Sequence, residues 1–193
     1  VGNLGGGSYP SVRVYENTGG ALSPAWSSTN LNDSTNSVAW GDWDGDGDLD
    51  LAVGSDQWPN RVYENTGGAL SLAWSSTEPA DATMDVAWGD WDNDGDLDLA
   101  VGNYAQANRV YENSGGALSL AWSSTETDET LSIAWADWDN DGDLDLAVGN
   151  NAQNRVYENT GGALSLAWTS IETSQSHALA WGDYDGDGDI DLA

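Results

Sequence analysis

The sequence predicts an all-β fold, a β-propeller of four-stranded blades, and three observations support this prediction. A unit of about 47 residues occurs four times along the 193-residue chain. Each unit holds short stretches that alternate between apolar and other residues, the period-two pattern of β-strands. No stretch has the period of an amphipathic helix. Four short strands in a repeat of this length are typical of a propeller blade.

One segment defines the repeat. It reads WGDWDGDGDLDLA from Trp40, WGDWDNDGDLDLA from Trp88, WADWDNDGDLDLA from Trp135 and WGDYDGDGDIDLA from Trp181. The first aspartates of the four copies lie 48, 47 and 46 residues apart. We expect a single domain over residues 1–193, with repeats at approximately 1–52, 53–100, 101–147 and 148–193. Four repeats correspond to a closed four-bladed propeller or to part of a larger ring or assembly.

The strands of each unit are expected in a fixed order. DLDLAVG, from Asp96, alternates leucine and valine with aspartate and alanine, and ALSLAW, from Ala69, alternates likewise. RVYEN, from Arg61, is a short β-branched and aromatic run, and the Asn-Thr-Gly-Gly around its end supplies the positive-φ residues of a tight hairpin. A parallel β-helix is the alternative, but its coils are shorter and lack hairpin turns.

Tryptophan recurs at two fixed positions of the repeat. We expect both sets to fill the space between blades, because each blade is sandwiched between neighbours and needs apolar residues on both faces. The sets are Trp40, Trp88, Trp135 and Trp181, and Trp26, Trp74, Trp122 and Trp168.

Composition excludes several function classes. The formal net charge is −29, from 33 acidic residues against four arginines and no lysine, so the phosphate backbone of a nucleic acid would be repelled. No apolar run reaches the roughly 18 to 20 residues needed to span a bilayer. The chain has no cysteine, which excludes disulfides and thiolate metal sites. Twelve tryptophans indicate a folded core rather than a disordered acidic tail.

The acidic residues are concentrated in the repeated segment. Counting Asp90 as position one, carboxylates stand at positions one, three, five, seven and nine, with glycine at six. This order resembles the first half of an EF-hand calcium loop, and a hard cation needs several such oxygens brought together by a tight turn. Glycine or asparagine at positions four and six tolerates the left-handed backbone of such a turn. Valine at position twelve, as in Val101, excludes a true EF-hand.

The segment and its spacing resemble the FG-GAP or VCBS repeat of integrin-like calcium-binding propellers. The resemblance implies one Ca²⁺ per repeat, about four in all, with magnesium disfavoured because it demands strict octahedral geometry. The implied side-chain ligands are Asp42, Asp44, Asp46 and Asp50; Asp90, Asp92, Asp94 and Asp98; Asp137, Asp139, Asp141 and Asp145; and Asp183, Asp185, Asp187 and Asp191. Asp48, Asp96, Asp143 and Asp189 would each add a backbone carbonyl.

These features predict an extracellular or cell-surface module for adhesion or for binding a glycan or protein ligand. Catalysis is not expected, because the loop carboxylates are committed to metal and the single histidine, His177, lies in a polar stretch. The loops that vary between repeats carry aromatic residues, Tyr9, Trp58 and Tyr104, that can stack on a ligand. The alternative is a structural protein that assembles into a filament or surface layer by continuing its repeats.

The two ends of the sequence suggest how the propeller closes. Joining Asp191-Leu192-Ala193 to Val1-Gly2-Asn3 spells DLAVGN, the string that runs unbroken from Asp98 and from Asp145. We therefore expect strands from the two ends to pair in one blade, preferably within one chain, and alternatively between neighbouring chains in a larger ring or filament.

Overall fold

The computed structural model describes residues 12–29, 33–78 and 81–193. Three four-stranded antiparallel sheets form complete blades, and two two-stranded sheets flank them. The all-β fold predicted from the sequence is confirmed. The blades are blade I, with β3 (Ser34–Gly41), β4 (Asp50–Asp56), β5 (Arg61–Thr66) and β6 (Ala69–Ser75); blade II, with β7 (Thr83–Gly89), β8 (Asp98–Asn103), β9 (Arg109–Asn113) and β10 (Leu118–Ser123); and blade III, with β11 (Thr130–Ala136), β12 (Asp145–Asn150), β13 (Arg155–Asn159) and β14 (Leu164–Thr169).

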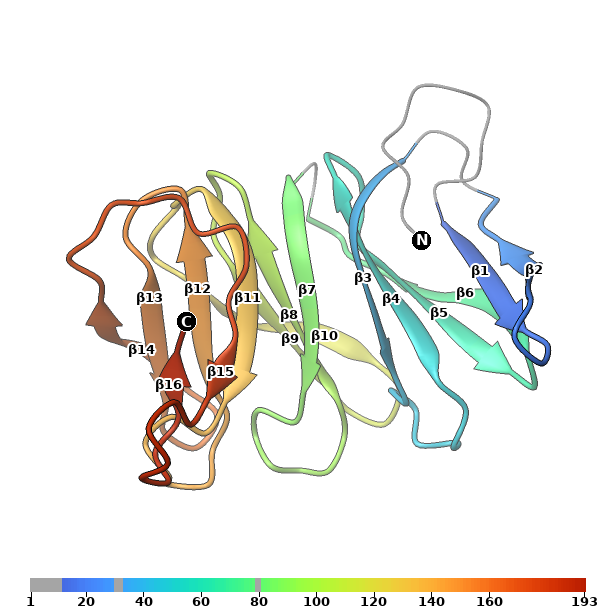
Figure 1. The fold of residues 1–193 in the computed structure, drawn as a ribbon. Helices are drawn as coiled ribbons and strands as arrows, with labels where there is room; N and C mark the ends of the chain where they lie inside the picture. The colour runs from blue at the N-terminus through green and yellow to red at the C-terminus, as the bar shows by residue number, and fades with distance from the viewer. Residues whose placement is uncertain (1–11, 30–32, 79–80) are drawn as a thin grey trace.

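The two outer sheets are half-blades. The first half-blade holds β1 (Arg13–Asn17) and β2 (Leu22–Ser27), and the last half-blade holds β15 (Trp181–Gly182) and β16 (Asp191–Leu192). The sheets fan out side by side in an arc, with the first half-blade at the right of Figure 1 and the last half-blade at the left. Strands β3, β7 and β11 contact one another from blade to blade and form the inner edge of the fan.

Within each blade the strands lie in the order in which they occur in the chain, so each strand forms a hairpin with the next one. The turn between the third and fourth strands uses the paired glycines, for example Gly67 at φ 63° and Gly68 at φ 93°. Such positive φ angles are readily adopted by glycine, and the predicted tight hairpin is confirmed. A blade begins at its β3-type strand, so the repeat boundaries expected near residues 52, 100 and 147 fall within the second strand of each blade.

The core lies between the blades. Strands β8 and β12 are buried along their whole lengths, because each blade is covered on both faces. One cluster joins blades I and II through Trp43, Val62 and Tyr111, and a second joins blades II and III through Trp91 and Tyr157.

The tryptophan sets lie between blades as expected, except at the two ends. Trp88 and Trp135 pack partly buried against these clusters, as do Trp74 and Trp122 of the other set. Trp40 and Trp168 are instead 47% and 43% exposed. Sequence reasoning missed a third set at position two of the acidic segment, where Trp43 and Trp91 are almost fully buried.

The expectation that the chain closes on itself is not met in this structure. The first and last half-blades are separate two-stranded sheets at opposite ends of the arc, with three complete blades between them. Residues 1–11, which include the Val1-Gly2-Asn3 stretch, lie outside the described residues. Within the part of the chain that is described, no helix is long and apolar enough to cross a membrane.

Candidate metal centre

Each acidic segment forms a loop between the first and second strands of a blade. In blade II the loop spans residues 90–98 and connects β7 to β8 at the lower edge of Figure 1. In each loop three carboxylates offer oxygens that all lie within 4.8 Å of one another. The groups are Asp42, Asp44 and Asp50; Asp90, Asp92 and Asp94; Asp137, Asp139 and Asp145; and Asp183, Asp185 and Asp191.

The loop curls because two of its positions adopt left-handed backbone. In blade II these are Asn93 at φ 60° and Gly95 at φ 97°. The other loops repeat the pair at Gly45 and Gly47, Asn140 and Gly142, and Gly186 and Gly188. The conformation expected at positions four and six is confirmed in all four loops.

Backbone amides orient the carboxylates of the loop. The amide of Gly95 donates to Oδ2 of Asp90 over 3.1 Å, and the amide of Asp94 donates to Oδ1 of Asp92 over 3.2 Å. The amide of Asp96 donates to Oδ1 of Asp94 over 2.9 Å. The aspartates are thus held in place by the turn itself, which reduces the ordering cost of binding a cation.

The ninth position is the most buried. Asp98 is fully buried, and its Oδ2 and Oδ1 accept hydrogen bonds from the amides of Trp91 and Asn113 over 2.9 and 2.8 Å. Burial raises the pKa of Asp98 to about 6, despite these two bonds, which lower it. Burial also raises the pKa of Asp50 and Asp145, the equivalent residues of blades I and III. An adjacent cation would offset this cost by stabilising the charged form of each carboxylate.

Two buried carboxylate oxygens lack a hydrogen-bond partner in the described part of the chain. Oδ1 of Asp42 and Oδ1 of Asp90, both at position one, are inaccessible to solvent and accept no hydrogen bond. An orphaned buried carboxylate oxygen is costly unless it binds a cation. Because both orphaned atoms belong to residues of the carboxylate groups described above, the loops of blades I and II fit a hard metal ion.

The structure brings together three of the four side chains expected in each loop. Positions one and three belong to all four groups, and the third member is position nine in blades I and III and the last half-blade, but position five in blade II. The position-seven side chains, expected only to lend a carbonyl, have a structural role that sequence reasoning missed. Asp48, Asp96 and Asp143 accept hydrogen bonds from Gly67, Gly115 and Gly161 of the hairpin in their own blade.

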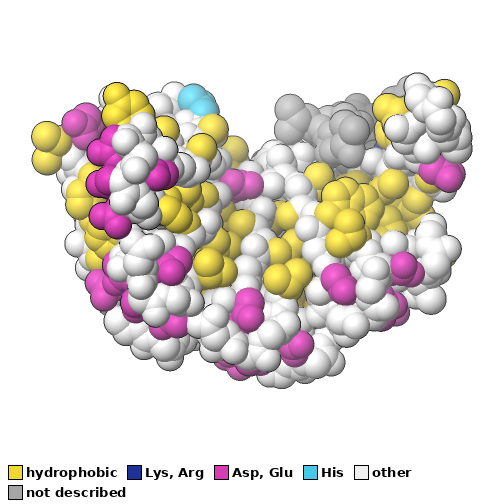
Figure 2. All heavy atoms as spheres, turned by 60° about the horizontal axis from the view of Figure 1, so that its bottom comes forward, with side chains coloured by type: hydrophobic (Ala, Val, Ile, Leu, Met, Phe, Trp, Pro, Cys, Tyr) yellow, Lys and Arg dark blue, Asp and Glu magenta, His cyan; other side chains and the backbone are white. Residues whose placement is uncertain are grey.

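The fourth loop is more open than the others. Asp183, Asp185 and Asp191 are all exposed, whereas Asp50 and Asp145 are fully buried in their loops. The last half-blade contains no third and fourth strand to cover its loop. Acidic side chains spread over the face drawn in Figure 2, on which no lysine or arginine is visible.

The two candidate ligand-binding aromatics lie on loops after the second strand of a blade. Trp58 follows β4 and is 45% exposed. Tyr104 follows β8 and forms an isolated β-bridge with Glu129, whose carboxylate accepts a hydrogen bond from the tyrosine and raises its pKa. They stand on neighbouring blades, and the third candidate, Tyr9, lies outside the described residues.

Solved structures of other proteins share the fold of this chain. The structure is similar to the crystal structure of BBS1N in complex with ARL6DN, soaked with lead, with a TM-score of 0.58 and 14% identity over 77% of this chain and 48% of that chain. It is also similar to the computationally designed Ika4 protein, with a TM-score of 0.58 and 13% identity over 83% of this chain and 90% of that chain. The chain thus spans about half the length of the BBS1N chain.

No curated protein matches the sequence. A family model does match it, and the matches run over residues 4–53, 42–101, 90–148 and 137–193, so that together they cover nearly the whole chain. Each matched segment after the first begins at an acidic loop, at Asp42, Asp90 or Asp137. The chain therefore belongs to the FG-GAP-like repeat family.

Proposed function

We propose that the protein is a calcium-binding propeller module with one Ca²⁺ in each of its four loops. The observation that carries the proposal is the orphaned, buried Oδ1 of Asp42 and of Asp90 within groups of converging carboxylates. Calcium takes six to eight oxygen ligands in flexible geometry, which suits carboxylates on a curled loop. Magnesium is disfavoured, because it requires near-octahedral geometry and keeps several of its waters.

The ion would be structural rather than catalytic. Bound calcium would neutralise part of the −29 charge and hold together a loop whose carboxylates otherwise repel one another. Because the loop is bonded to the hairpin of the same blade, through Asp96 and Gly115 in blade II, an ordered loop also orders that hairpin. We infer no catalytic role for this module.

The loops and their chemistry favour a protein that works outside the cell. Extracellular modules bind calcium with dissociation constants of about 10⁻⁴ to 10⁻³ M, a range that cytosolic calcium would leave empty. Adhesion, or binding of a glycan or protein, is the role that fits a rigid scaffold with variable loops, and exposed Trp58 supports it. The fourfold repeat favours a second candidate, a structural protein that assembles into a filament or surface layer by continuing its repeats.

Thermal unfolding with Ca²⁺, with Mg²⁺ and with a chelator tests the calcium proposal. Ca²⁺ at a hundredfold excess over its Kd contributes about 2.7 kcal/mol for each independent site. We expect a large rise in melting temperature with Ca²⁺ only, and calorimetric titration should give about four sites per chain. Identical melts in Ca²⁺ and chelator would refute the proposal.

A further inference from the structure

Neighbouring acidic loops are joined to one another from blade to blade. They are loop I (residues 42–50), loop II (90–98), loop III (137–145) and loop IV (183–191). Two kinds of hydrogen-bonded link connect them, one on the surface and one in the core. Each link connects a residue inside one loop with a residue that belongs to the next loop or holds it in place, so the loops form a connected series along the fan.

The surface link joins position four of one loop to position seven of the next. The side-chain amide of Asn93 in loop II donates to Oδ1 of Asp143 in loop III over 2.6 Å. The side-chain amide of Asn140 in loop III donates to Oδ1 of Asp189 in loop IV over 3.1 Å. Position four of loop I is Gly45, which has no side chain to make this bond. The surface link therefore joins loops II, III and IV but does not join loop I to loop II.

Asp143 connects the surface link to its own blade. Its Oδ2 accepts a hydrogen bond from the amide of Gly161, in the hairpin between β13 and β14, over 2.8 Å. Position seven is also the position whose backbone carbonyl is expected to bind the ion. One side chain thus holds a ligand-bearing residue of loop III against both the hairpin of blade III and loop II.

The buried link uses the asparagine at the end of the third strand. In blade III the backbone amide of Asn159 donates to Oδ1 of Asp145, at position nine of loop III, over 2.8 Å. The side-chain amide of Asn159 donates to the carbonyl of Trp91, at position two of loop II, over 2.5 Å. Asn113 makes the same two kinds of bond between loops I and II. Both asparagines are fully buried, so the buried link is present at both junctions.

The hairpin of one blade also lies against the loop of the blade before it. A Cβ built on Gly162 would lie 3.6 Å from Cβ of Asp92, at position three of loop II. A Cβ built on Gly116 would lie 3.7 Å from Cβ of Asp44, at position three of loop I. Asp92 and Asp44 belong to the converging carboxylate groups. An ion that orders one loop therefore also restrains the hairpin of the next blade, and that hairpin holds position seven of its own loop.

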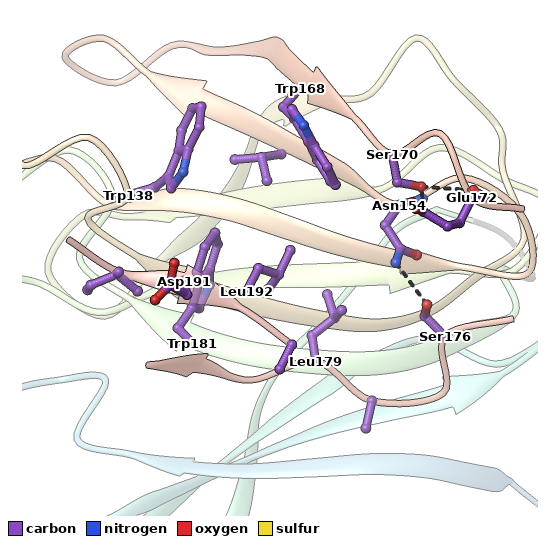
Figure 3. Close-up of a pocket in the computed structure, with 14 residues that line it drawn as sticks. Trp138, Asn154, Trp168, Ser170, Glu172, Ser176, Leu179, Trp181, Asp191 and Leu192 are labelled. Atoms are coloured by element: carbon purple, nitrogen blue, oxygen red, sulfur yellow. Dashed lines mark hydrogen bonds between the residues drawn. The ribbon is translucent and has the colours of Figure 1, made fainter. Parts of the chain in front are cut away.

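Loops III and IV are neighbours in the same way. Trp138, at position two of loop III, and Asp191, at position nine of loop IV, line one groove of about 420 Å³, which Figure 3 shows. The amide of Trp138 donates to Oδ2 of Asp145 over 2.7 Å, within loop III. Position two of one loop and position nine of the next thus lie in the same neighbourhood here, as they do where Asn113 and Asn159 join them.

We propose that the loops bind calcium as a coupled series, in which an ion in one loop raises the calcium affinity of the next, most strongly between loops II and III. This inference rests on the calcium sites proposed above. A bond between two loops forms fully only when both loops are ordered, so the cost of ordering the second loop is lower once the first holds its ion. The effect on affinity is equal in both directions. The links change the calcium concentration at which a loop binds, not the number of loops that bind.

Repulsion between two bound ions acts in the opposite direction and is the weaker effect. The middle of each loop is exposed, as at Asn93 and Asp94, and charges in water are screened over about 8 Å at physiological ionic strength. Each loop carries five carboxylates, so it keeps a net negative charge after it binds Ca²⁺. The links, in contrast, include hydrogen bonds to carboxylates, which are about twice as strong as bonds between neutral groups.

The two complete junctions differ in a way that substitutions can exchange. Loops II and III share both links, whereas loops I and II share only the buried link. Asn93→Gly gives the first junction the chemistry of the second, and Gly45→Asn does the reverse, with Asp96 as the acceptor by position in the repeat. Both residues have left-handed backbone, at φ 60° for Asn93 and φ 73° for Gly45, which glycine and asparagine both adopt. Neither exchange should therefore disturb the curl of the loop.

Hydrogen exchange measured by mass spectrometry during a calcium titration tests the coupling loop by loop. The readout is the free Ca²⁺ concentration that gives half of the full protection of the loop amides, which in loop III include those of Gly142 and Asp143. Asp92→Ala removes a carboxylate of loop II and keeps the Cβ that faces the next hairpin. We expect this substitution to raise the Ca²⁺ concentration that loop III requires by about fivefold. With Asn93→Gly also present, Asp92→Ala should raise it by a smaller factor, because only the buried link remains.

The junction between loops I and II provides the matched control. Asp44→Ala removes the equivalent carboxylate of loop I, and the Ca²⁺ concentration that loop II requires should rise by less than that of loop III does after Asp92→Ala. Gly45→Asn should make this rise larger, because it supplies the donor for the surface link. The two exchanges at position four are expected to act in opposite directions, which a general loss of stability would not produce. Circular dichroism in Ca²⁺ checks that every variant is folded.

The possible outcomes separate this inference from the calcium proposal. If Asp92→Ala leaves the Ca²⁺ requirement of loop III unchanged, or lowers it, the loops are not positively coupled and the inference is wrong, while the calcium proposal stands. If Asn93→Gly does not reduce the effect of Asp92→Ala, the surface link does not carry the coupling, and the inference is again wrong. If Ca²⁺ protects none of the loops, the calcium proposal itself fails.

Discussion

The backbone amide of Asn113 donates to Oδ1 of Asp98 over 2.8 Å, and both residues are fully buried. The bond ties the acidic loop of blade II to the end of β9 in the same blade. The side-chain amide of Asn113 also donates to the carbonyls of Trp43 in the preceding blade and of Leu97, over 2.6 and 3.2 Å. One asparagine therefore connects the candidate metal loop, the hairpin after β9 and the junction between blades I and II.

Asn113→Ala should lower the free energy of unfolding by about 2 kcal/mol, because it leaves buried carbonyls without a donor. The backbone amide that bonds Asp98 remains in this variant, so calcium affinity at the loop should fall less than stability. Chemical denaturation with and without Ca²⁺ measures both effects. Ser114→Ala, at the neighbouring exposed position, should change stability by less than about 0.5 kcal/mol. If Asn113→Ala lowers the free energy of unfolding by no more than Ser114→Ala does, Asn113 does not link the loop to the neighbouring blade.

Asp92→Ala should remove one calcium site and leave the other three, because each carboxylate group comes from a single loop. Calorimetric titration should fall from about four sites to about three, and the melting temperature in Ca²⁺ should drop only in part. Glu158→Gln removes one negative charge from β13, outside the loops, and is the control for charge alone. Loss of all calcium binding in Asp92→Ala would show that the loops are not independent.

The hydrogen bond between Tyr111 and Glu78 should make stability depend on pH. The Tyr111 hydroxyl donates to Oε2 of Glu78 over 2.7 Å. Burial opposes ionisation of Glu78, but this bond and others outweigh it and lower its pKa below the usual 4.5. A lowered pKa in the folded state means that the contribution is present above pH 4.5 and is lost as pH falls through the folded value.

Tyr111→Phe removes this hydrogen bond and should therefore cost about 1 kcal/mol at pH 7 and progressively less below pH 4.5. Burial, followed by the hydrogen bond to Glu78, raises the pKa of Tyr111, so the tyrosine stays neutral across this range. Denaturation midpoints of the two proteins from pH 3 to pH 8 provide the measurement. Tyr184→Phe, at a residue that is 91% exposed, should show no such difference. If the difference in denaturation midpoint between the original protein and Tyr111→Phe stays constant with pH, the substitution acts through packing alone.

The sequence predicted the strands and the loops well because both depend on local patterns. Alternation placed DLDLAVG in a strand, which the structure forms from Asp98 onward as β8, and glycine at position six placed the curl at Gly95. The buried role of Trp43 and Trp91 was missed, because a tryptophan between two aspartates in an acidic loop has no apolar neighbours in sequence to indicate burial. Its partners come from the next blade, about 70 residues away, as the bond from Asn113 to Trp43 shows.

The expected closure within one chain is not seen in the described residues, and the sequence could not decide it for a physical reason. The string shared by Asp191-Leu192-Ala193 and Val1-Gly2-Asn3 shows only that the two ends continue the same repeat. It contains no information about the curvature of the blades between them. Curvature is set by packing between blades, such as the contact of Trp88 with Gly41, and no local pattern in the sequence encodes it.

Trp58 is the best candidate for a ligand contact, because a half-exposed indole on a variable loop contributes little to folding. If the loops bind a glycan, Trp58→Ala should abolish binding on a glycan array and shift the melting temperature by no more than about 2 °C. Tyr104→Ala should reduce binding and also cost some stability, because the hydroxyl bonds Glu129 across the junction between blades II and III. Tyr104→Phe then separates the two effects, since it keeps the ring and removes only that bond. The control is Leu120→Ala, whose side chain is also 45% exposed but lies on a strand rather than on a variable loop. A lower melting temperature for Trp58→Ala with unchanged glycan binding would assign the indole to loop packing and remove the main support for adhesion.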